Sequence, residues 1–316
     1  MYTSRFPNWM LSTALFVLWL AGASLSYGEN LKPEDIVAKS LDSMGTSQAR
    51  TAATSRVNEG KVQFRVLSGG VGNLEGKGVL VSQGRKLQFF MKFPNNDYRG
   101  EQFVTDGDKV RVAATTSRQN RSSLGQFVFS QDAIVKEGLL GGEISTAWPL
   151  LNLQERKAKL SYEGEKTIDG KKLLDVRYKP KKSSDLDIHL YFEPDTYRHV
   201  MTVYTLRIRP GIGHVDEQLS NAQATGADLG PSPIATGGVV TESSETATAH
   251  GSETRYRLEE HFSDFKTVDG LTLPSHYNIH FTQELGNGPT TVSEWDITTD
   301  QINNNVTLDP KNFEVK

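Results

Sequence analysis

Apolar and polar residues alternate along most of the chain after about residue 57, and this period of two is typical of β-strands with one buried face. Val62, Phe64 and Val66 lie on one side of the first such segment, and the same alternation returns over 87–93. Glycine-rich turns between the segments fit hairpin connections. The pattern therefore predicts an antiparallel meander, which resumes later with strands over 158–167, 173–178, 186–192, 199–208, 256–265, 271–281 and 290–297.

Two stretches follow a helical period instead. The first begins at Pro33, a favourable first-turn residue, carries one apolar stripe and ends at Gly45. The second, over about 126–153, is strongly apolar but is interrupted by Gly141-Gly142 and Pro149, so it predicts a broken helical insert. Because strands and helices do not alternate regularly, the order favours a mainly β (α+β) fold, with an antiparallel sheet and helices on one face.

One long segment departs from both periods. From about 210 to 253 the chain is rich in Gly, Ala, Ser, Thr and Pro and has few large apolar residues, so it cannot bury enough surface to offset its ordering entropy. We interpret it as a flexible loop inserted between two neighbouring strands of a single domain spanning 29–316. A linker between two domains is the alternative, although the strand rhythm is the same on both sides.

The N-terminal 28 residues have the pattern of a secretory signal peptide. Arg5 is their only charge, the apolar part runs from Trp9 to Ala23, and small residues that suit cleavage follow it. That apolar part is shorter than the ~20 residues of a permanent membrane span, although an uncleaved anchor is the alternative. The sequence thus predicts an exported, periplasmic protein with no permanent membrane anchor. Since it has no cysteine, it has neither disulfides nor a lipid-attachment cysteine.

The charge balance argues against nucleic acid as a partner. The chain has 35 Lys and Arg against 38 Asp and Glu, and no dense basic stripe with interleaved aromatic residues. Its densest basic run, Lys179-Pro-Lys-Lys182, lies between two predicted strands and is interpreted as a solvated hairpin tip. The glycine pairs lack the lysine and the strand-to-helix setting of a nucleotide loop, and we predict no cofactor.

Catalytic and metal-binding patterns are weak, and we predict no enzymatic activity. His276 and His280 are four residues apart on a predicted strand, some 13 Å from each other, which is too far to share an ion. The acidic residues near 185–195 include Asp187 and Glu193. Because a pair of carboxylates can cleave a glycosidic bond, an exported glycan hydrolase is a weaker alternative.

Large apolar side chains come from many strands and from the helical insert. A single sheet with helices on one face can place such side chains around an apolar cavity, whereas an ordinary closed core explains the same spacing and is favoured by the sequence pattern alone. The candidate ligand-binding residues are Phe64, Phe89, Met91, Trp148, Leu150, Leu190, Phe192, Phe262, Ile279, Phe281 and Trp295.

Several segments resemble recurrent segments of bacterial outer-membrane lipoprotein-sorting-like (LolA/LolB-like) periplasmic proteins. The opening helix that ends in Met44-Gly45 and the following Gly60-Lys-Val-Gln-Phe64 resemble the N-terminal part of those proteins. The remaining segments are Glu163-Gly164-Glu-Lys-Thr-Ile-Asp169-Gly170-Lys-Lys-Leu, Ile188-His-Leu-Tyr191-Phe192-Glu193-Pro194-Asp195-Thr196 and Phe262-Ser-Asp264-Phe-Lys-Thr-Val-Asp269-Gly270-Leu-Thr-Leu-Pro274.

The resemblance implies an incomplete, strongly curved antiparallel β-barrel with helices plugging its concave side over an apolar cavity. Members of the family bind acyl chains of lipoproteins or other lipids, and related domains act as envelope-stress sensors. We therefore expect a periplasmic carrier whose partners are lipid or lipoprotein acyl chains, with a role in lipoprotein sorting as the finer hypothesis. The alternative is a regulatory or adapter protein that binds another envelope protein through the same fold.

Overall fold

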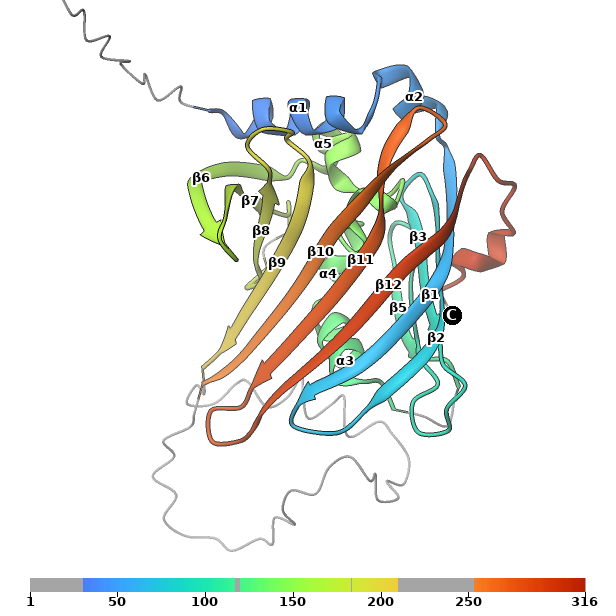
Figure 1. Cartoon of the computed structure of the whole chain (residues 1–316), viewed down its shortest axis with the longest axis vertical. Coiled ribbons are helices and arrows are strands. Elements are labelled where there is room, and N and C mark those ends of the chain that lie inside the picture. Colours follow the sequence, from blue (N-terminus) through green and yellow to red (C-terminus); the bar gives the residue numbers. More distant parts are fainter. Residues whose placement is uncertain (1–30, 117–119, 183, 210–252, 316) are drawn as a thin grey trace, which may run out of the picture. The chain divides into compact units, whose positions relative to one another are not determined.

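The computed structural model describes residues 31–116, 120–182, 184–209 and 253–315 (Figure 1). The predicted signal peptide and nearly all of the predicted loop over 210–253 lie outside these residues. All elements below belong to the unit Lys32–Lys316. Within the described ranges, no helix combines the length and the apolar character needed to cross a membrane.

Twelve strands form one antiparallel sheet that does not close, and the predicted mainly β fold class is confirmed. The strands lie in the order β5-β4-β3-β2-β1-β12-β11-β10-β9-β8-β7-β6, so that β5 and β6 are its two edges. Their bounds are β1 Ser55–Ser68, β2 Asn73–Gln83, β3 Lys86–Lys92, β4 Glu101–Thr105, β5 Val110–Ala114, β6 Lys159–Ile168, β7 Lys171–Lys179, β8 Asp187–Phe192, β9 His199–Ile208, β10 Thr254–Val268, β11 Leu271–Glu284 and β12 Thr290–Asn304.

Pairing of β1 with β12 joins the two halves of the sheet. Phe64 is opposite Trp295 in this pair, and their rings lie 5.1 Å apart. Every other pair in the sheet joins strands that are consecutive in the chain, and among the described strands β5 and β6 are the only consecutive ones that do not pair. Hairpins connect most of the paired strands. β9 and β10 pair with each other on either side of the segment 210–252.

The first predicted helix is α1, Pro33–Met44. Its apolar stripe, which includes Ile36 and Met44, is buried, and Glu34 and Asp35 stand in the first turn, where the helix dipole favours acidic side chains. Gly45 ends it with a φ of 149° and forms an isolated bridge to Leu271 at the start of β11. The short helix α2, Ser47–Ala52, then leads into β1.

A broken helical insert links the two edge strands and spans residues 123–156. Its elements lie on the face of the sheet toward which the large apolar side chains point, and Figure 1 shows α3 and α4 against the strands. Left-handed glycines, which include Gly138 and Gly141, separate the pieces. The elements are α3 Ser123–Ser130, α4 Ala133–Lys136, η1 Gly142–Ile144, η2 Pro149–Asn152 and α5 Leu153–Arg156.

The opposite face of the sheet is covered only locally. Near the C-terminus, η3, Pro310–Phe313, packs on β3, and the Phe313 side chain is buried there. A small apolar cluster of Leu173, Tyr191, Met201 and Val203 lies over β7 to β9. The main core therefore lies between the sheet and the helical insert.

Candidate functional site

The eleven candidate ligand-binding residues gather between the sheet and the helical insert. Ten of them are at most 2% exposed, and only Phe64 is half-buried. Trp148 and Leu150 come from the insert, and the others come from strands. The rings pack on one another: Phe262 and Tyr277 stack in parallel with centroids 5.2 Å apart.

Packing is tight in one part of this interior. A void between Leu80, Phe89, Ile144 and Tyr277 has a volume of about 10 Å³, room for roughly one water molecule. Pockets that hold a small ligand measure roughly 300–1,000 Å³. The packing at this point thus corresponds to the closed-core alternative, and a ligand of acyl-chain size requires the insert to move.

Apolar contacts hold the insert against strands β10 and β11. Phe127 of α3 stacks on Tyr256 of β10 and lies 5.3 Å from the ring of Phe281 on β11. The backbone of Gly142 approaches Phe262 so closely that an added Cβ atom would lie 2.7 Å from the ring. The insert therefore packs directly against the apolar face of these strands.

Buried Arg56 on β1 holds the middle of the insert. Its guanidinium donates hydrogen bonds to the backbone carbonyls of Glu143 (2.9 Å) and Ile144 (3.0 Å), and to Oδ1 of Asn304 (2.8 Å). Asn58 donates a further bond to the Ile144 carbonyl at 3.2 Å. Burial lowers the pKa of Arg56 to about 10 and raises the pKa of the Glu143 carboxyl to about 8.

A second polar contact lies on β10. Oε1 of Glu260 accepts a hydrogen bond from the Gly141 backbone N–H at 2.7 Å and another from the Tyr277 hydroxyl, and Oε2 accepts one from the Tyr204 hydroxyl at 2.5 Å. Glu260 is completely buried, and desolvation raises its pKa to about 7 although these hydrogen bonds oppose the shift. This acid thus connects two core tyrosines to the insert.

The start of the insert is fixed by Glu101 on β4. Its two carboxyl oxygens accept hydrogen bonds from the backbone N–H and the hydroxyl of Ser122, each at 2.7 Å. Ser122 is the N-cap of α3, and its hydroxyl accepts a bond from the Gly125 N–H. Burial raises the pKa of Glu101.

These polar residues were not among the sequence-based candidates, although one signal for them exists. Glu260 alternates with Leu258 and Phe262, so it occupies a position of its strand that faces the core. An ionisable residue at an apolar position of an alternating strand indicates a buried polar contact. Its partners, however, come from residues 17 to 119 positions away.

The histidine and carboxylate patterns do not form a catalytic or metal site. Among the described residues, no group of three His, Cys, Asp or Glu side chains is arranged to hold a metal ion. Asp187 and Glu193 flank the six-residue strand β8, which separates them by roughly 20 Å at ~3.3 Å per residue, beyond the ~5–10 Å of a glycosidase pair. His189 is half-buried on the face of the sheet opposite the main core and contacts Asp175 at 2.6 Å.

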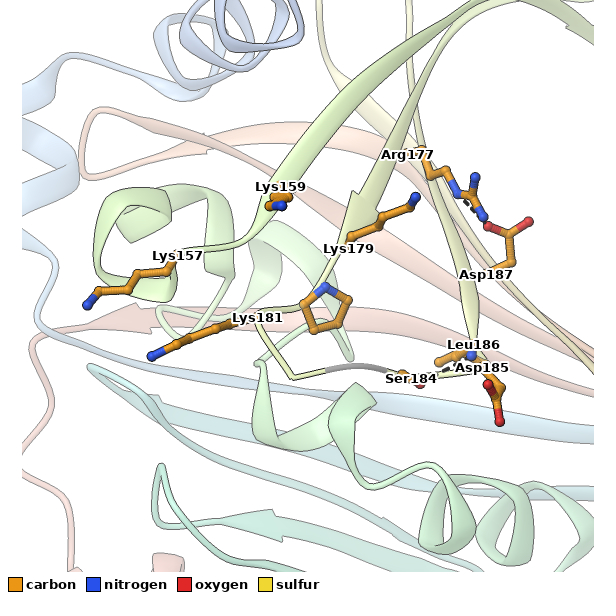
Figure 2. Close-up of a pocket in the computed structure, with 10 residues that line it drawn as sticks. Lys157, Lys159, Arg177, Lys179, Lys181, Ser184, Asp185, Leu186 and Asp187 are labelled. Atoms are coloured by element: carbon orange, nitrogen blue, oxygen red, sulfur yellow. Dashed lines mark hydrogen bonds and ion pairs between the residues drawn. The ribbon is translucent and has the colours of Figure 1, made fainter.

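A separate pocket of about 490 Å³ lies where β6, β7 and β8 meet the end of α5 (Figure 2). Five basic and two acidic side chains line it, and Figure 2 shows the Arg177 and Asp187 side chains joined at one end. We call it the basic groove. It is lined by Lys157, Lys159, Arg177, Lys179, Pro180, Lys181, Ser184, Asp185, Leu186 and Asp187.

Several solved structures are similar to this chain. A LolA superfamily protein from Nitrosomonas europaea matches 90% of this chain and 98% of its own, with 12% identity and a TM-score of 0.43. A DUF1329 family protein from Desulfovibrio piger matches 88% and 95%, with 12% identity and a TM-score of 0.42. A Vibrio parahaemolyticus domain named for outer membrane lipoprotein sorting matches 88% and 97%, with 11% identity and a TM-score of 0.37.

No family model and no curated protein matches the sequence. The resemblance seen in the sequence segments is thus accompanied by similar solved structures.

Proposed function

We propose that the chain is a periplasmic carrier that shelters acyl chains of lipids or lipoproteins on the concave face of its sheet. The observation that carries this proposal is the arrangement of the core, in which an unclosed apolar sheet is covered by a separate helical insert. In the closed state the insert packs against this face, and in a ligand-bound state the acyl chain replaces part of it.

The energetics of this exchange are favourable. Burying one methylene group is worth ~0.8 kcal/mol, so sheltering most of a 14- to 16-carbon chain supplies roughly 10 kcal/mol before ordering costs. The proposal needs no catalytic group, because affinity comes from apolar area.

The structure of the insert supports its movement. Its helices have at most eight residues, and left-handed glycines separate them, so each piece is only marginally stable without its packing. The contacts that hold it include buried ionisable groups, namely Arg56, Glu143 and Glu260. Burying such groups has a large desolvation cost, so the closed state gains less free energy than an all-apolar core of equal area would.

A disulfide that fixes the insert tests the proposal. The Thr146 backbone N–H donates to Oγ of Ser82 at 2.9 Å, so the Ser82 side chain lies against the backbone at position 146. Since the chain has no native cysteine, the pair Ser82→Cys and Thr146→Cys introduces one defined crosslink between insert and sheet. We expect the oxidised variant to lose at least tenfold in affinity for a fluorophore-labelled 16-carbon fatty acid and for a triacylated lipopeptide, and to recover on reduction.

The matched control is a crosslink that leaves the insert free. Thr267 and Thr272 lie opposite each other on the β10–β11 hairpin, with their hydroxyl oxygens 3.4 Å apart. The pair Thr267→Cys and Thr272→Cys should bind the probes like the parent chain in both redox states. Equal binding by both oxidised variants would place the ligand elsewhere. An absence of any bound lipid, in native mass spectra of the periplasmic protein and in titrations of the parent chain, would end the carrier proposal.

A second candidate function is binding of another envelope protein, and the tight packing in one part of the interior favours it. Another protein could add a strand to the sheet at edge strand β6. One side of β6 pairs with β7, whereas its other side has no neighbour within the sheet. Crosslinking in cells followed by affinity purification tests this function. One stable protein partner together with a lipid-free, unresponsive interior would favour it over the carrier.

A further inference from the structure

The basic groove has a strong excess of positive charge in a chain whose formal net charge is −3. Its one ion pair joins Arg177 to Asp187 at 2.7 Å, which neutralises the Arg177 end. Its four lysines form no ion pair with any carboxylate of the described residues. The lysine end of the groove is therefore uncompensated.

Two short stretches of backbone, 157–159 and 179–181, bring these lysines together. Lys157 follows α5 with a left-handed φ of 54°, Lys159 begins β6, Lys179 ends β7, and Lys181 lies in the following turn. Lys159 and Lys179 are directly opposite in the β6–β7 register, so they share one face of the sheet. Figure 2 shows the Lys157 and Lys181 side chains extending away from Asp187 and the Lys179 side chain extending toward Arg177. Like charges opposite each other are unfavourable unless an anion lies between them.

The groove lies on the face of the sheet opposite the candidate cavity. Lys179 adjoins Tyr178, whose side chain points the other way and donates a hydrogen bond to Glu137 just after α4 of the insert, at 3.1 Å. Because neighbouring strand residues point to opposite faces, a ligand of the groove does not enter the core.

We propose that the basic groove is a binding site for a phosphate-bearing anion, either a free phosphate compound or the headgroup of a phospholipid. Its volume of about 490 Å³ fits a small ligand, and lysine ammonium groups bind phosphate as mobile point charges with three donors each. The Arg177–Asp187 pair forms the wall at the other end and confines the anion to the lysine side.

The test uses the full exported chain and the double variant Lys179→Ser with Lys181→Ser. One arm titrates glycerol 3-phosphate and inorganic phosphate by calorimetry, and the other sediments the protein with vesicles of phosphatidylglycerol or of phosphatidylcholine. Each lysine removed should weaken binding about fivefold, so the pair should weaken it roughly 25-fold. Added salt should weaken it further.

Lys171 and Lys172 supply the control, because both are exposed at the far end of β7. The double variant Lys171→Ser with Lys172→Ser removes the same charge and should bind like the parent. Phosphate binding that only the groove variant loses supports a free-anion ligand, and selective loss of sedimentation with phosphatidylglycerol supports a headgroup. Equal losses in both variants, no binding in either arm of the parent, or binding only of acidic peptides would overturn the proposal. None of these outcomes depends on the disulfide experiment, since the interior is not involved.

Discussion

At the scale of single residues, the main feature is the number of ionisable groups in an otherwise apolar interior. Arg56, Glu101, Glu143 and Glu260 are all at most 2% exposed, and each contacts the helical insert or the residues beside it. A core selected only for stability would replace them with apolar side chains. Their presence at the boundary between sheet and insert indicates that this boundary has a role besides packing.

Glu260 should make the stability of the protein fall as pH rises. Its pKa in the folded chain is about 7, above the ordinary 4.5, so between these values the folded protein keeps a proton that the unfolded chain releases. The free energy of unfolding should decrease over this window, by up to roughly 3 kcal/mol, and level off above it. Urea denaturation at pH 4.5, 6 and 8 measures this, and Glu260→Gln should flatten the profile.

The neighbouring residue provides the control. Glu259 points to the other face of β10 and pairs with Arg257 at 2.7 Å, so Glu259→Gln should retain the slope of the parent. Glu143 and Glu101, whose pKa values are also raised, should leave a residual slope in Glu260→Gln, and replacing Glu143 by Gln as well should reduce it further. Burial lowers the pKa of His199 to about 3, which contributes a slope of the opposite sign, so the comparison is between variant and parent. The same slope in Glu260→Gln and in the parent would show that Glu260 is ionised throughout.

Arg56 and Glu143 should behave as a coupled pair. Arg56→Met leaves the Glu143 carbonyl without its donor and removes a positive charge that acts on the Glu143 carboxyl. The Ile144 carbonyl loses one donor and keeps Asn58 as the other. We therefore expect a loss of about 3 kcal/mol in the free energy of unfolding. Adding Glu143→Gln should recover part of that loss, which a double-mutant cycle by chemical denaturation measures. Arg255→Met, in an exposed ion pair with Glu253, should have no measurable effect. Strict additivity of the Arg56 and Glu143 substitutions would contradict the coupling.

At the scale of elements, the sequence predicts most of the fold. The apolar stripe from Pro33 to Met44 predicts helix α1 because its apolar residues recur at the helical period. The alternation around Phe89 predicts strand β3 because its apolar residues recur at every second position. β2 is not evident, since Gly76 and Gly78 occupy its core-facing positions. At Gly76 an added Cβ would lie 2.2 Å from the Lys92 carbonyl, so a tertiary contact explains the glycine there.

The candidate site is less predictable than the fold. The apolar residues are identified correctly as interior, but whether they enclose space depends on how the insert packs, and no local pattern encodes that. The basic groove is missed for a similar reason. Lys179 and Lys181 suggest a solvated hairpin tip until β6 and α5 bring Lys157 and Lys159 beside them. The candidate cavity and the basic groove both depend on segments that are distant in the sequence, so the local spacing of apolar and polar residues does not reveal them.

Two glycines with the same backbone conformation should respond differently to alanine. Gly138 in the insert and Gly170 in the β6–β7 turn have φ values of 74° and 77°. An added Cβ at Gly138 would lie 2.2 Å from the Ala147 carbonyl oxygen, whereas at Gly170 nothing lies within 4 Å. Gly170→Ala should therefore cost only the left-handed penalty of about 1 kcal/mol, and Gly138→Ala clearly more.

Denaturation midpoints compare these two variants, and limited proteolysis locates the damage. In Gly138→Ala the first cleavages should fall within the insert, because strain between α4 and η1 loosens that segment before the sheet. Equal stability losses in the two variants, or first cleavages in the strands, would mean that the backbone around residue 138 adjusts to the added methyl group without strain.

At the scale of the whole molecule, one sheet is assembled from both ends of the chain. β1 and β12 pair over residues more than 220 positions apart, as Val62 with Ile297 and Arg65 with Glu294. Such pairing has a high entropic cost, so it forms late unless the intervening hairpins are already ordered. The resemblance of sequence segments anticipates this architecture, whereas residue periods alone predict only an antiparallel sheet with helices on one face.

The same topology makes the segment 210–252 dispensable for folding if the chain is a single domain. Its flanking residues meet where Arg209 Nε lies 3.4 Å from Glu253 Oε2, and β9 pairs with β10 up to Ile208 and Thr254. Replacing 210–252 by a four-residue turn with Asn-Gly at its centre shortens the connection roughly tenfold, which should stabilise the fold by about 2 kcal/mol through loop-closure entropy. The melting temperature and the acyl-chain affinity of the shortened chain, each compared with the parent chain, test this prediction. A higher melting temperature with unchanged binding fits one domain whose ligand lies under the insert. A folded chain that binds no lipid would place part of the ligand site in the removed segment. A chain that no longer folds would show the single-domain prediction to be wrong.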